Sequence, residues 1–188
     1  MIFRYSYMTP EGFDNLVMES DGEVLTGLLF EGGCDAARHA SDSDDGFDPD
    51  IRAFQDTRRW LDAYFSRQQP DFIPPYRIVG ATPFRTEVVR EMLEIPYGET
   101  ATYGEIASKI ARRRGVARMS AQAVGGAVGW NPICIIIPCH RVMGAHGAIT
   151  GYGGGIHNKA ALLNLEKSSQ LANCEPALPP IDGCKRPL

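Results

Sequence analysis

The sequence predicts a small α/β unit in the first half of the chain and a mostly helical unit in the second half. Three observations lead to this prediction. Apolar residues alternate at the N-terminus, as in a strand buried on one face, and near residue 60 they recur at helical spacing. Beyond residue 80 a helix, a short turn and a second helix follow one another, which is the outline of a helix-turn-helix or winged-helix unit.

In the first half, segments 1–7 and 22–33 are expected to be strands, and glycines bound the second one. Segment 34–50 is acidic and has no apolar periodicity, so it predicts a solvated loop rather than a calcium site. Segment 50–68 predicts an amphipathic helix. A proline-rich connection follows and contains the expected domain boundary, which divides the chain into 1–79, 80–168 and a C-terminal tail, 169–188.

Clear helix starts mark the second half. The Thr-Pro pair at 82–83 predicts an N-cap with proline at the first helical position. Thr100 or Thr102 can cap the next helix, and Ser120 can cap the one after a short linker. A last helix is expected at 157–168, after a glycine-rich loop.

Composition limits the classes of protein that fit. The formal net charge of −4 argues against a protein coated with positive charge, although it allows a local basic face. No apolar run is long enough to cross a membrane and the N-terminus lacks a signal peptide, so we expect a cytoplasmic protein. The five cysteines are scattered without metal-ligand spacing, which predicts free thiols and no zinc site.

The segment NPICIIIPCHRV carries the main chemical signal. Residues 133–137 are apolar and predict a buried strand that Pro138 ends, with Cys139 and His140 at its exit. A thiol needs a base to become a nucleophilic thiolate, and histidine is the usual one. Neighbouring side chains on an extended chain point to opposite faces, so a bridging water is expected between these two.

A carboxylate should orient that histidine. Glu166 on the last helix is the best candidate, and four glutamates compete with it: Glu91, Glu94, Glu99 and Glu105. A buried cysteine can also be simply a small core residue, so the Cys-His pair alone leaves catalysis open.

A basic cluster lies in ten residues that contain no acid: Lys109, Arg112, Arg113, Arg114 and Arg118. One helix dipole does not require this many cations, so phosphate contacts are the favoured interpretation. The next helix carries small residues at Ala121, Ala123, Gly125, Gly126 and Ala127, and glycine inside a helix is costly. Either another protein segment or a ligand is expected to approach closely there.

Together these segments resemble a known family. In order they are ATPFRTEVVREMLEIPYGETATYGEIA, SAQAVGGAVGWNPICIIIPCHRV, and the GYGGG and KAALLNLE segments, which cover about residues 80–167. They are similar to the O6-alkylguanine-DNA alkyltransferases, also called methylated-DNA–protein-cysteine methyltransferases, and the PCHRV block is the most specific part. The resemblance implies an N-terminal α/β domain with an RNase H-like sheet, then a helical domain with a helix-turn-helix.

The resemblance implies a single-use repair reaction. An alkyl group would pass from O6-alkylguanine, or from O4-alkylthymine, in double-stranded DNA to Cys139 after the damaged base is flipped out. His140 would act as a base through a water molecule and Glu166 would orient it. A monomer without metal or organic cofactor would suffice for this chemistry.

Further roles follow from the same resemblance. Residues that would hold or read the flipped base and its surroundings are Tyr103, Asn131, Val142, Tyr152 and Gly153, with main-chain groups of Cys139. The close fit to the minor groove would involve Ala121, Ala123 and Gly125, and Arg141 would be structural.

One position departs from the family pattern. Many members have an arginine that fills the gap left by the flipped base, and this chain has Gln122, which brings no charge. We therefore expect weaker and more sequence-tolerant DNA binding. Some members also bind zinc in the N-terminal domain, and Cys34 with His39 supplies too few ligands for that here.

Two other functions fit part of the sequence. The first is a lesion sensor or DNA-binding regulator without chemistry, but inactive relatives lack the cysteine that this chain keeps. The second is a thiol hydrolase that uses Cys139, His140 and Glu166, which leaves the helix-turn-helix and the basic cluster unexplained.

Overall fold

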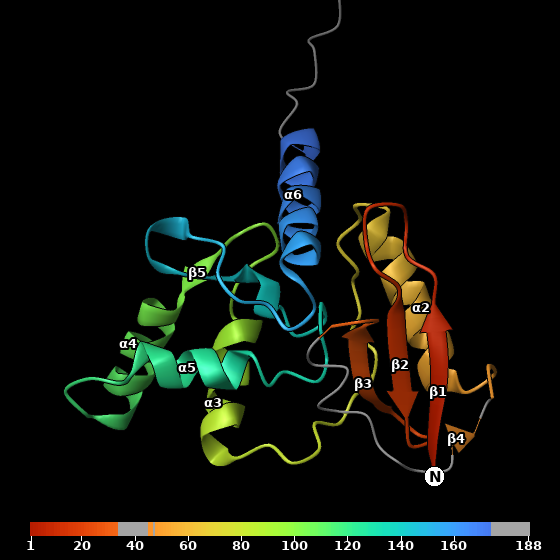
Figure 1. Ribbon diagram of the computed structural model, residues 1–188, viewed down its shortest axis with the longest axis horizontal. Coiled ribbons are helices and arrows are strands. Elements are labelled where there is room, and N and C mark those ends of the chain that lie inside the picture. The colour runs from red at the N-terminus through yellow and green to blue at the C-terminus, as the bar shows by residue number, and fades with distance from the viewer. Residues whose placement is uncertain (34–44, 47, 174–188) are drawn as a thin grey trace, which may run out of the picture.

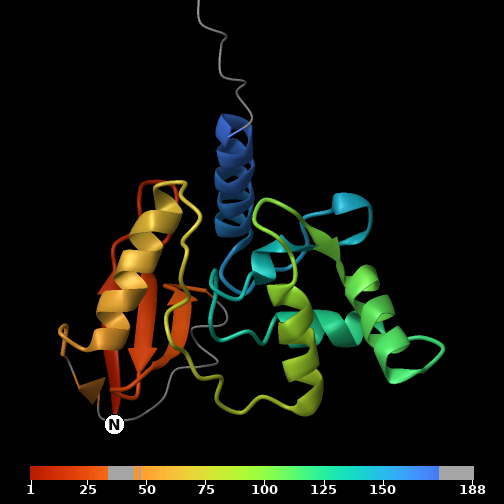
Figure 2. The same cartoon turned by 180° about the vertical axis from the view of Figure 1, so that it is seen from behind.

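The computed structural model describes residues 1–33, 45–46 and 48–173. Two units stand side by side, a sheet unit formed by the first part of the chain and a helical unit formed by the second (Figures 1 and 2). The last helix rises between them in both views. This arrangement agrees with the α/β and helical halves that the sequence predicts.

The sheet unit has four strands in the order β3-β2-β1-β4. Their bounds are Ile2–Tyr7 (β1), Leu16–Ser20 (β2), Leu25–Phe30 (β3) and Asp45–Gly46 (β4). The β1–β2 and β2–β3 pairs are antiparallel, whereas β1 and β4 are parallel. The sequence predicted β1 and β3 but missed β2. The two residues of β4 lie in the segment that was predicted to be entirely loop, and most of that acidic segment lies outside the described residues.

Helix α2 (Arg52–Phe65) covers one face of this sheet, as Figure 1 shows. Its apolar residues recur at helical spacing, and Phe54, Leu61 and Tyr64 are almost completely buried. The proline-rich connection then leads to the helical unit. A main-chain bridge between Leu25 and Tyr76 ties this connection back to β3.

Three helices build the helical unit: α3 (Pro83–Leu93), α4 (Tyr103–Arg114) and α5 (Ala121–Val128). Each starts where the sequence predicts, because Thr82, Thr102 and Ser120 cap them with their side chains. Thr102 forms a capping box with Glu105, and Gly115 ends α4 in the left-handed conformation. These local signals explain why the helix boundaries were predictable.

The predicted strand at 133–137 is wrong. The chain there makes tight turns, and Ile135 has a positive φ of 69°, which no strand contains. Ile133 forms only an isolated bridge with Leu28, and a short 3-10 helix, η1 (Cys139–Arg141), follows. An apolar run without periodicity shows that a segment is buried, but it does not distinguish a strand from a buried turn.

After η1 the chain enters β6 (Val142–Met143), which pairs in parallel with β5 (Ala101–Thr102). A second 3-10 turn, η2 (Ala145–Gly147), leads into the glycine-rich loop. The last helix, α6, spans Ile156–Asn173 and so runs five residues beyond the expected end at 168. The remainder of the predicted tail lies outside the described residues, with Cys174 and Cys184. Among the described helices, none has the length and apolar character to span a membrane.

Candidate active site

Cys139 begins η1, and its residue surface is only 4% exposed. The Asn131 side chain holds it from behind, because its Nδ2 lies 3.0 Å from Cys139 Sγ. The same amide group donates to the Ile137 carbonyl at 2.9 Å, and its Oδ1 accepts the Ile133 N–H at 3.1 Å. Asn131 therefore fixes the turn and offers a donor to the sulfur, and an amide donor stabilises a thiolate.

His140 and Glu166 meet in the interior, as the sequence predicts. His140 Nε2 lies 2.8 Å from Glu166 Oε1, and neither residue is exposed. Burial lowers the pKa of His140 below its ordinary value of 6.5, although the Glu166 charge opposes this. The imidazole is therefore neutral near pH 7 and can accept a proton.

Arg141 and main-chain groups neutralise the buried charge of Glu166. The Arg141 guanidinium contacts both carboxylate oxygens, with distances of 2.9 Å to Oε1 and 3.0 Å to Oε2. The Gly98 N–H donates to Oε2 at 2.9 Å. Burial alone would raise the pKa of Glu166, but the bonds from His140 and Arg141 lower it to about 2, so the carboxylate stays ionised.

An ionised Glu166 determines which nitrogen of His140 carries the hydrogen. A carboxylate only accepts hydrogen bonds, so Nε2 must be the N–H and Nδ1 must carry the lone pair. His140 Nδ1 is buried and has no hydrogen-bond partner among the described residues. Nδ1 is therefore the nitrogen of His140 that can accept a proton.

The glycine-rich loop closes over the sulfur. The Tyr152 hydroxyl oxygen lies 3.9 Å from Cys139 Sγ, and burial keeps the pKa of Tyr152 well above its ordinary value. Lys159 on α6 is completely buried, and its ammonium group donates to the Val142 carbonyl at 2.6 Å and to the Thr150 carbonyl at 3.2 Å. Val142 and Thr150 lie on either side of η2, so Lys159 joins both sides of this turn to α6.

The sheet unit supports this loop from behind. A Cβ added at Gly33 would lie 2.6 Å from the Gly153 carbonyl oxygen, and one added at Gly154 would lie 2.6 Å from the Phe30 ring. Both glycines are required here because backbone and ring approach closely. The position of Gly153 therefore depends on the end of β3.

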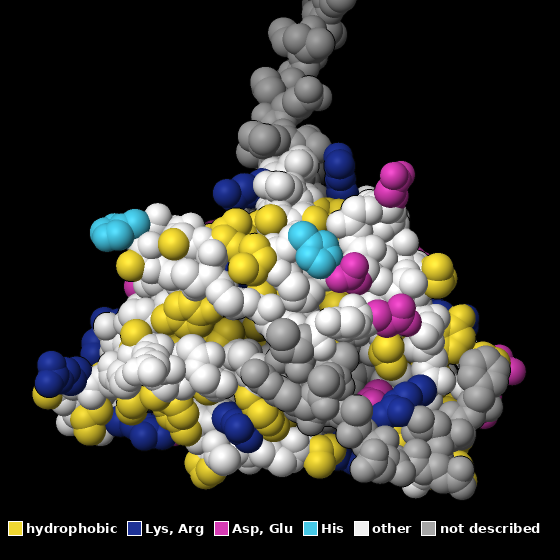
Figure 3. Space-filling model, viewed as in Figure 1, with side chains coloured by type: hydrophobic (Ala, Val, Ile, Leu, Met, Phe, Trp, Pro, Cys, Tyr) yellow, Lys and Arg dark blue, Asp and Glu magenta, His cyan; other side chains and the backbone are white. Residues whose placement is uncertain are grey.

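Helix α5 presents a bare surface beside Tyr103. A Cβ at Gly125 would meet the Tyr103 ring at 3.8 Å, whereas a Cβ at Gly126 would meet nothing within 4 Å. Gly126 is exposed, and no described segment packs against it. Ala121, Gln122 and Ala123 are exposed at the start of the same helix. Figure 3 shows a hollow lined by hydrophobic side chains between α5 and the η2 region.

The predicted basic cluster divides into two groups. Arg113 contacts the fully buried Glu91 at 2.6 Å, and Arg114 makes two 2.9 Å bonds to Glu87, so both are held by α3. Arg112 and Arg118 are exposed and have no ion pair within the described parts of the chain. The lack of acidic residues in segment 109–118 did not show that its cations are unpaired, because the carboxylates that pair with Arg113 and Arg114 come from the preceding helix, α3.

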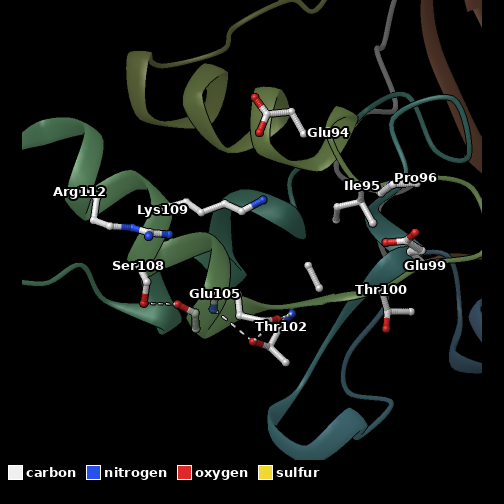
Figure 4. Close-up of a pocket in the computed structure, with 12 residues that line it drawn as sticks. Glu94, Ile95, Pro96, Glu99, Thr100, Thr102, Glu105, Ser108, Lys109 and Arg112 are labelled. Carbon is white, nitrogen blue, oxygen red and sulfur yellow. Dashed lines mark hydrogen bonds between the residues drawn. The ribbon is translucent and has the colours of Figure 1, made fainter.

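A separate hollow of about 650 Å³ lies between the end of α3 and α4. Lys109 and Arg112 extend from α4 on one side, while Glu94 and Glu99 lie on the other (Figure 4). Its lining does not include Cys139 or His140. This hollow is therefore distinct from the thiol site, and its mixed charge does not select an anion.

Two residues of the site were not predicted. Tyr64 of α2 donates to Glu166, and Lys159 organises the loop. Lys159 could have been found, because it precedes Glu166 by seven residues and so shares the buried face of α6. Tyr64 gave no signal beyond its place on an apolar helix face. No cluster of potential metal ligands occurs in the described residues, and Cys34 and His39 lie outside them.

Comparisons with known proteins agree on one family. A family model described as "6-O-methylguanine DNA methyltransferase, DNA binding domain" matches residues 83–168. The Mycobacterium tuberculosis methylated-DNA–protein-cysteine methyltransferase is 45% identical over 154 residues, which span 81% of this chain and 86% of that protein. The Haemophilus influenzae protein of the same name is 38% identical and spans 87% of this chain and 86% of its own length. The crystal structure of M. tuberculosis OGT in complex with DNA has a TM-score of 0.72 and 40% identity, with coverage of 89% of this chain and 93% of that one.

Proposed function

Because this chain belongs to the family of methylated-DNA–protein-cysteine methyltransferases, we propose that its Cys139 takes the alkyl group from O6-alkylguanine, and from O4-alkylthymine, in double-stranded DNA. The chain is a DNA-repair methyltransferase. The contacts around Cys139 support its assignment as the alkyl acceptor. Asn131 holds the sulfur, and Glu166 fixes the Nε2–H of the neutral His140, the next residue in the chain.

The transfer is an in-line displacement. His140 Nδ1 takes the thiol proton through a water molecule, and the thiolate attacks the alkyl carbon. An S–C bond forms and the C–O6 bond breaks, with its electron pair passing to the guanine. Burial raises the pKa of Tyr103, so its hydroxyl stays protonated and can donate to the departing base. The thioether is stable in water, so each protein molecule acts once.

The target base has to leave the duplex to reach the sulfur, because Cys139 is only 4% exposed. We assign the contact with the minor groove to α5, where the small side chains of Ala121, Ala123 and Gly125 allow DNA to approach the helix closely. Gln122 fills the gap in the base stack. The exposed Arg112 and Arg118 contact phosphates, and Arg113 and Arg114 hold α4 to α3.

Within the site, Tyr152 and Gly153 close the pocket over O6. The main-chain groups of Cys139 and Val142 read the guanine edge, although the Val142 carbonyl also accepts from Lys159. A carbonyl oxygen has two lone pairs and can serve both. Asn131 acts on the protein side of the sulfur rather than on DNA, since it is 1% exposed.

Finer features of the fold belong to the same proposal. The strand order β3-β2-β1-β4, with β1 and β4 parallel, supports an RNase H-like sheet. The α4–α5 pair, with β5 before it and β6 after it in a short parallel ladder, supports a helix-turn-helix with a minimal wing. We propose residues 1–79 and 80–168 as the two domains, acting together as a monomer.

A titration with lesion DNA tests this function. Increasing amounts of protein are incubated with a duplex that carries O6-[³H-methyl]guanine, and protein-bound label is counted. We expect one methyl group per protein molecule, none in Cys139→Ala, and one again in the control Cys134→Ala, which removes the other described buried thiol. Label that survives in Cys139→Ala, or continued turnover, would overturn the proposal. Lesion binding without label would indicate a sensor instead.

A further inference from the structure

We propose that Tyr64, contributed by helix α2 of the sheet unit, is a positioning residue for the proton relay, because its hydroxyl shares Glu166 Oε1 with His140. The inference rests on the proposed function, since it concerns the same relay. It assigns to the N-terminal half of the chain a part in positioning the relay.

The contacts around Glu166 Oε1 carry this inference. The Tyr64 hydroxyl donates to Oε1 at 2.7 Å, and His140 Nε2 reaches the same oxygen at 2.8 Å. The hydroxyl oxygen also lies 3.4 Å from His140 Nε2. The Arg141 guanidinium donates to Oε1 as well, at 2.9 Å. This one carboxylate oxygen thus receives donors from both units of the chain, and each donor partly neutralises its charge.

The packing around the Tyr64 ring holds its hydroxyl at the carboxylate. It stacks on Trp60 at 5.3 Å between ring centroids and meets Tyr97 of the helical unit edge-on at 5.9 Å. The residue is 1% exposed. A phenol held this rigidly acts as a preorganised donor, which costs no reordering when the proton moves.

Four groups act on the imidazole of His140. Glu166 and Lys159 come from α6, Arg141 from η1, and Tyr64 from α2. Glu166 favours the protonated imidazole, while Arg141 and Lys159 oppose it. Tyr64 also disfavours the protonated imidazole, because each donor on Oε1 weakens the electrostatic attraction between the carboxylate and the imidazolium.

The sign of the effect follows. Loss of the Tyr64 hydroxyl strengthens the Glu166 bond to His140 and raises the pKa of the imidazole. More of the histidine is then protonated at a given pH, and a protonated Nδ1 cannot accept the thiol proton. The acid limb of the transfer rate against pH should therefore move to higher pH. A stronger donor at the same position should move that limb to lower pH.

Two variants test the sign, with one matched control. Tyr64→Phe removes only the hydroxyl, and 3-fluorotyrosine at position 64 keeps the fold and strengthens the donor. The control is Tyr7→Phe, because Tyr7 is also a buried phenol in the sheet unit and donates to Asp62 of α2 at 2.7 Å, away from the site. Single-turnover rates with O6-methylguanine duplex are measured between acid and neutral pH, and folding is checked by thermal unfolding.

We expect Tyr64→Phe to shift the acid limb of the transfer rate to higher pH, so that transfer slows severalfold on that limb and less near pH 7. The fluorotyrosine protein should shift the limb downward, and Tyr7→Phe should keep the wild-type profile. Should Tyr64→Phe not fold, the fluorotyrosine shift alone decides. Profiles at position 64 that overlay the wild type, or that match Tyr7→Phe, would overturn the inference. Failure of the proposed function itself is seen separately, as wild-type protein that takes up no methyl group.

Discussion

The interior around Cys139 and the outer surface of α4 and α5 differ in where their polar groups find partners. In the interior, Glu166 binds His140, Arg141, Gly98 and Tyr64, and His140 Nδ1 is left to receive a proton. On the outer surface, Arg118 and Gln122 are exposed, and their side chains have no ion pair or hydrogen bond in the described structure. The polar groups of the interior are thus paired within the protein, whereas these two surface side chains are left unpaired in the described part of the chain.

This difference shows which functional assignments can be argued from geometry. A buried carboxylate, imidazole and thiol constrain one another, so the tautomer of His140 follows from the charge of Glu166. No comparable constraint fixes an exposed arginine. The division of the basic cluster was visible only because Glu87 and Glu91 on α3 hold two of its members.

The largest effect is expected from the interior. Glu166→Gln removes the charge that orients His140 and pairs with Arg141, so we expect the transfer rate to fall about 100-fold or more. Single-turnover transfer from O6-methylguanine duplex measures it. The control is Glu99→Gln, an exposed carboxylate that was a candidate on sequence alone, and it should keep the wild-type rate. A wild-type rate in Glu166→Gln would show that the buried carboxylate is not needed for transfer, and would contradict the distinction between the interior and the surface.

The buried pair should also make stability depend on pH. The pKa of His140 in the folded protein lies below 6.5, its ordinary value in the unfolded chain. The contribution of His140 to the free energy of unfolding is therefore complete above pH 6.5 and is lost as the pH falls toward the folded pKa. The pKa of Glu166 falls from 4.5 to about 2, so its contribution is lost between those values. Each proton taken up by the unfolded chain costs about 1.4 kcal/mol per pH unit.

Urea unfolding at a series of pH values measures this dependence. His140→Gln should reduce the loss of stability that occurs as the pH falls below 6.5. His146→Gln, which alters an exposed histidine, should leave that loss unchanged. A free energy of unfolding that stays constant between pH 7 and pH 5 would show that the imidazole is not buried in its neutral form.

A smaller effect is expected on the surface. Arg118→Ala removes an exposed cation, so DNA affinity should fall a few-fold and the salt slope of binding should decrease by about one. Arg114→Ala should keep the salt slope, because that guanidinium is engaged by Glu87. Binding to lesion duplex is measured by anisotropy over a range of salt concentrations. Equal slopes for both variants would contradict the division of the cluster.

The smallest effect concerns the position that departs from the family pattern. Gln122→Arg adds a charge to the exposed start of α5, and we expect lesion duplex to bind about three- to ten-fold more tightly at low salt. Gln68→Arg adds the same charge after α2 and serves as the control. Unchanged affinity in Gln122→Arg would count against a role for this side chain in the base stack.

Sequence alone predicted the features that depend on neighbouring residues. The caps at Thr82, Thr102 and Ser120 act within three residues of themselves. Thr82 and Ser120 were predicted as helix starts, and Thr102 was one of two predicted alternatives, with Thr100. Strand β2 was missed because it is short and its inward positions end in a serine, Ser20, which hides the alternation. The 133–137 turn was taken for a strand because burial on all sides removes any periodicity.

Contacts between distant segments were harder to predict. Cys139 and His140 are adjacent in sequence and could be singled out, but Glu166 was one of five candidate carboxylates until the packing of α6 selected it. Tyr64 lies 102 residues from Glu166, and its position on the apolar face of α2 is what any core tyrosine shows. Only the packing of the sheet unit against the helical unit brings its hydroxyl to the relay.

Identification of the alkylated atom tests the central claim most directly. The protein is incubated with O6-methylguanine duplex and digested, and fragment masses are used to separate Cys134 from Cys139. The account predicts a gain of one methyl group on Cys139 and none on Cys134. A methyl group on any other residue, or no gain in mass, would contradict it.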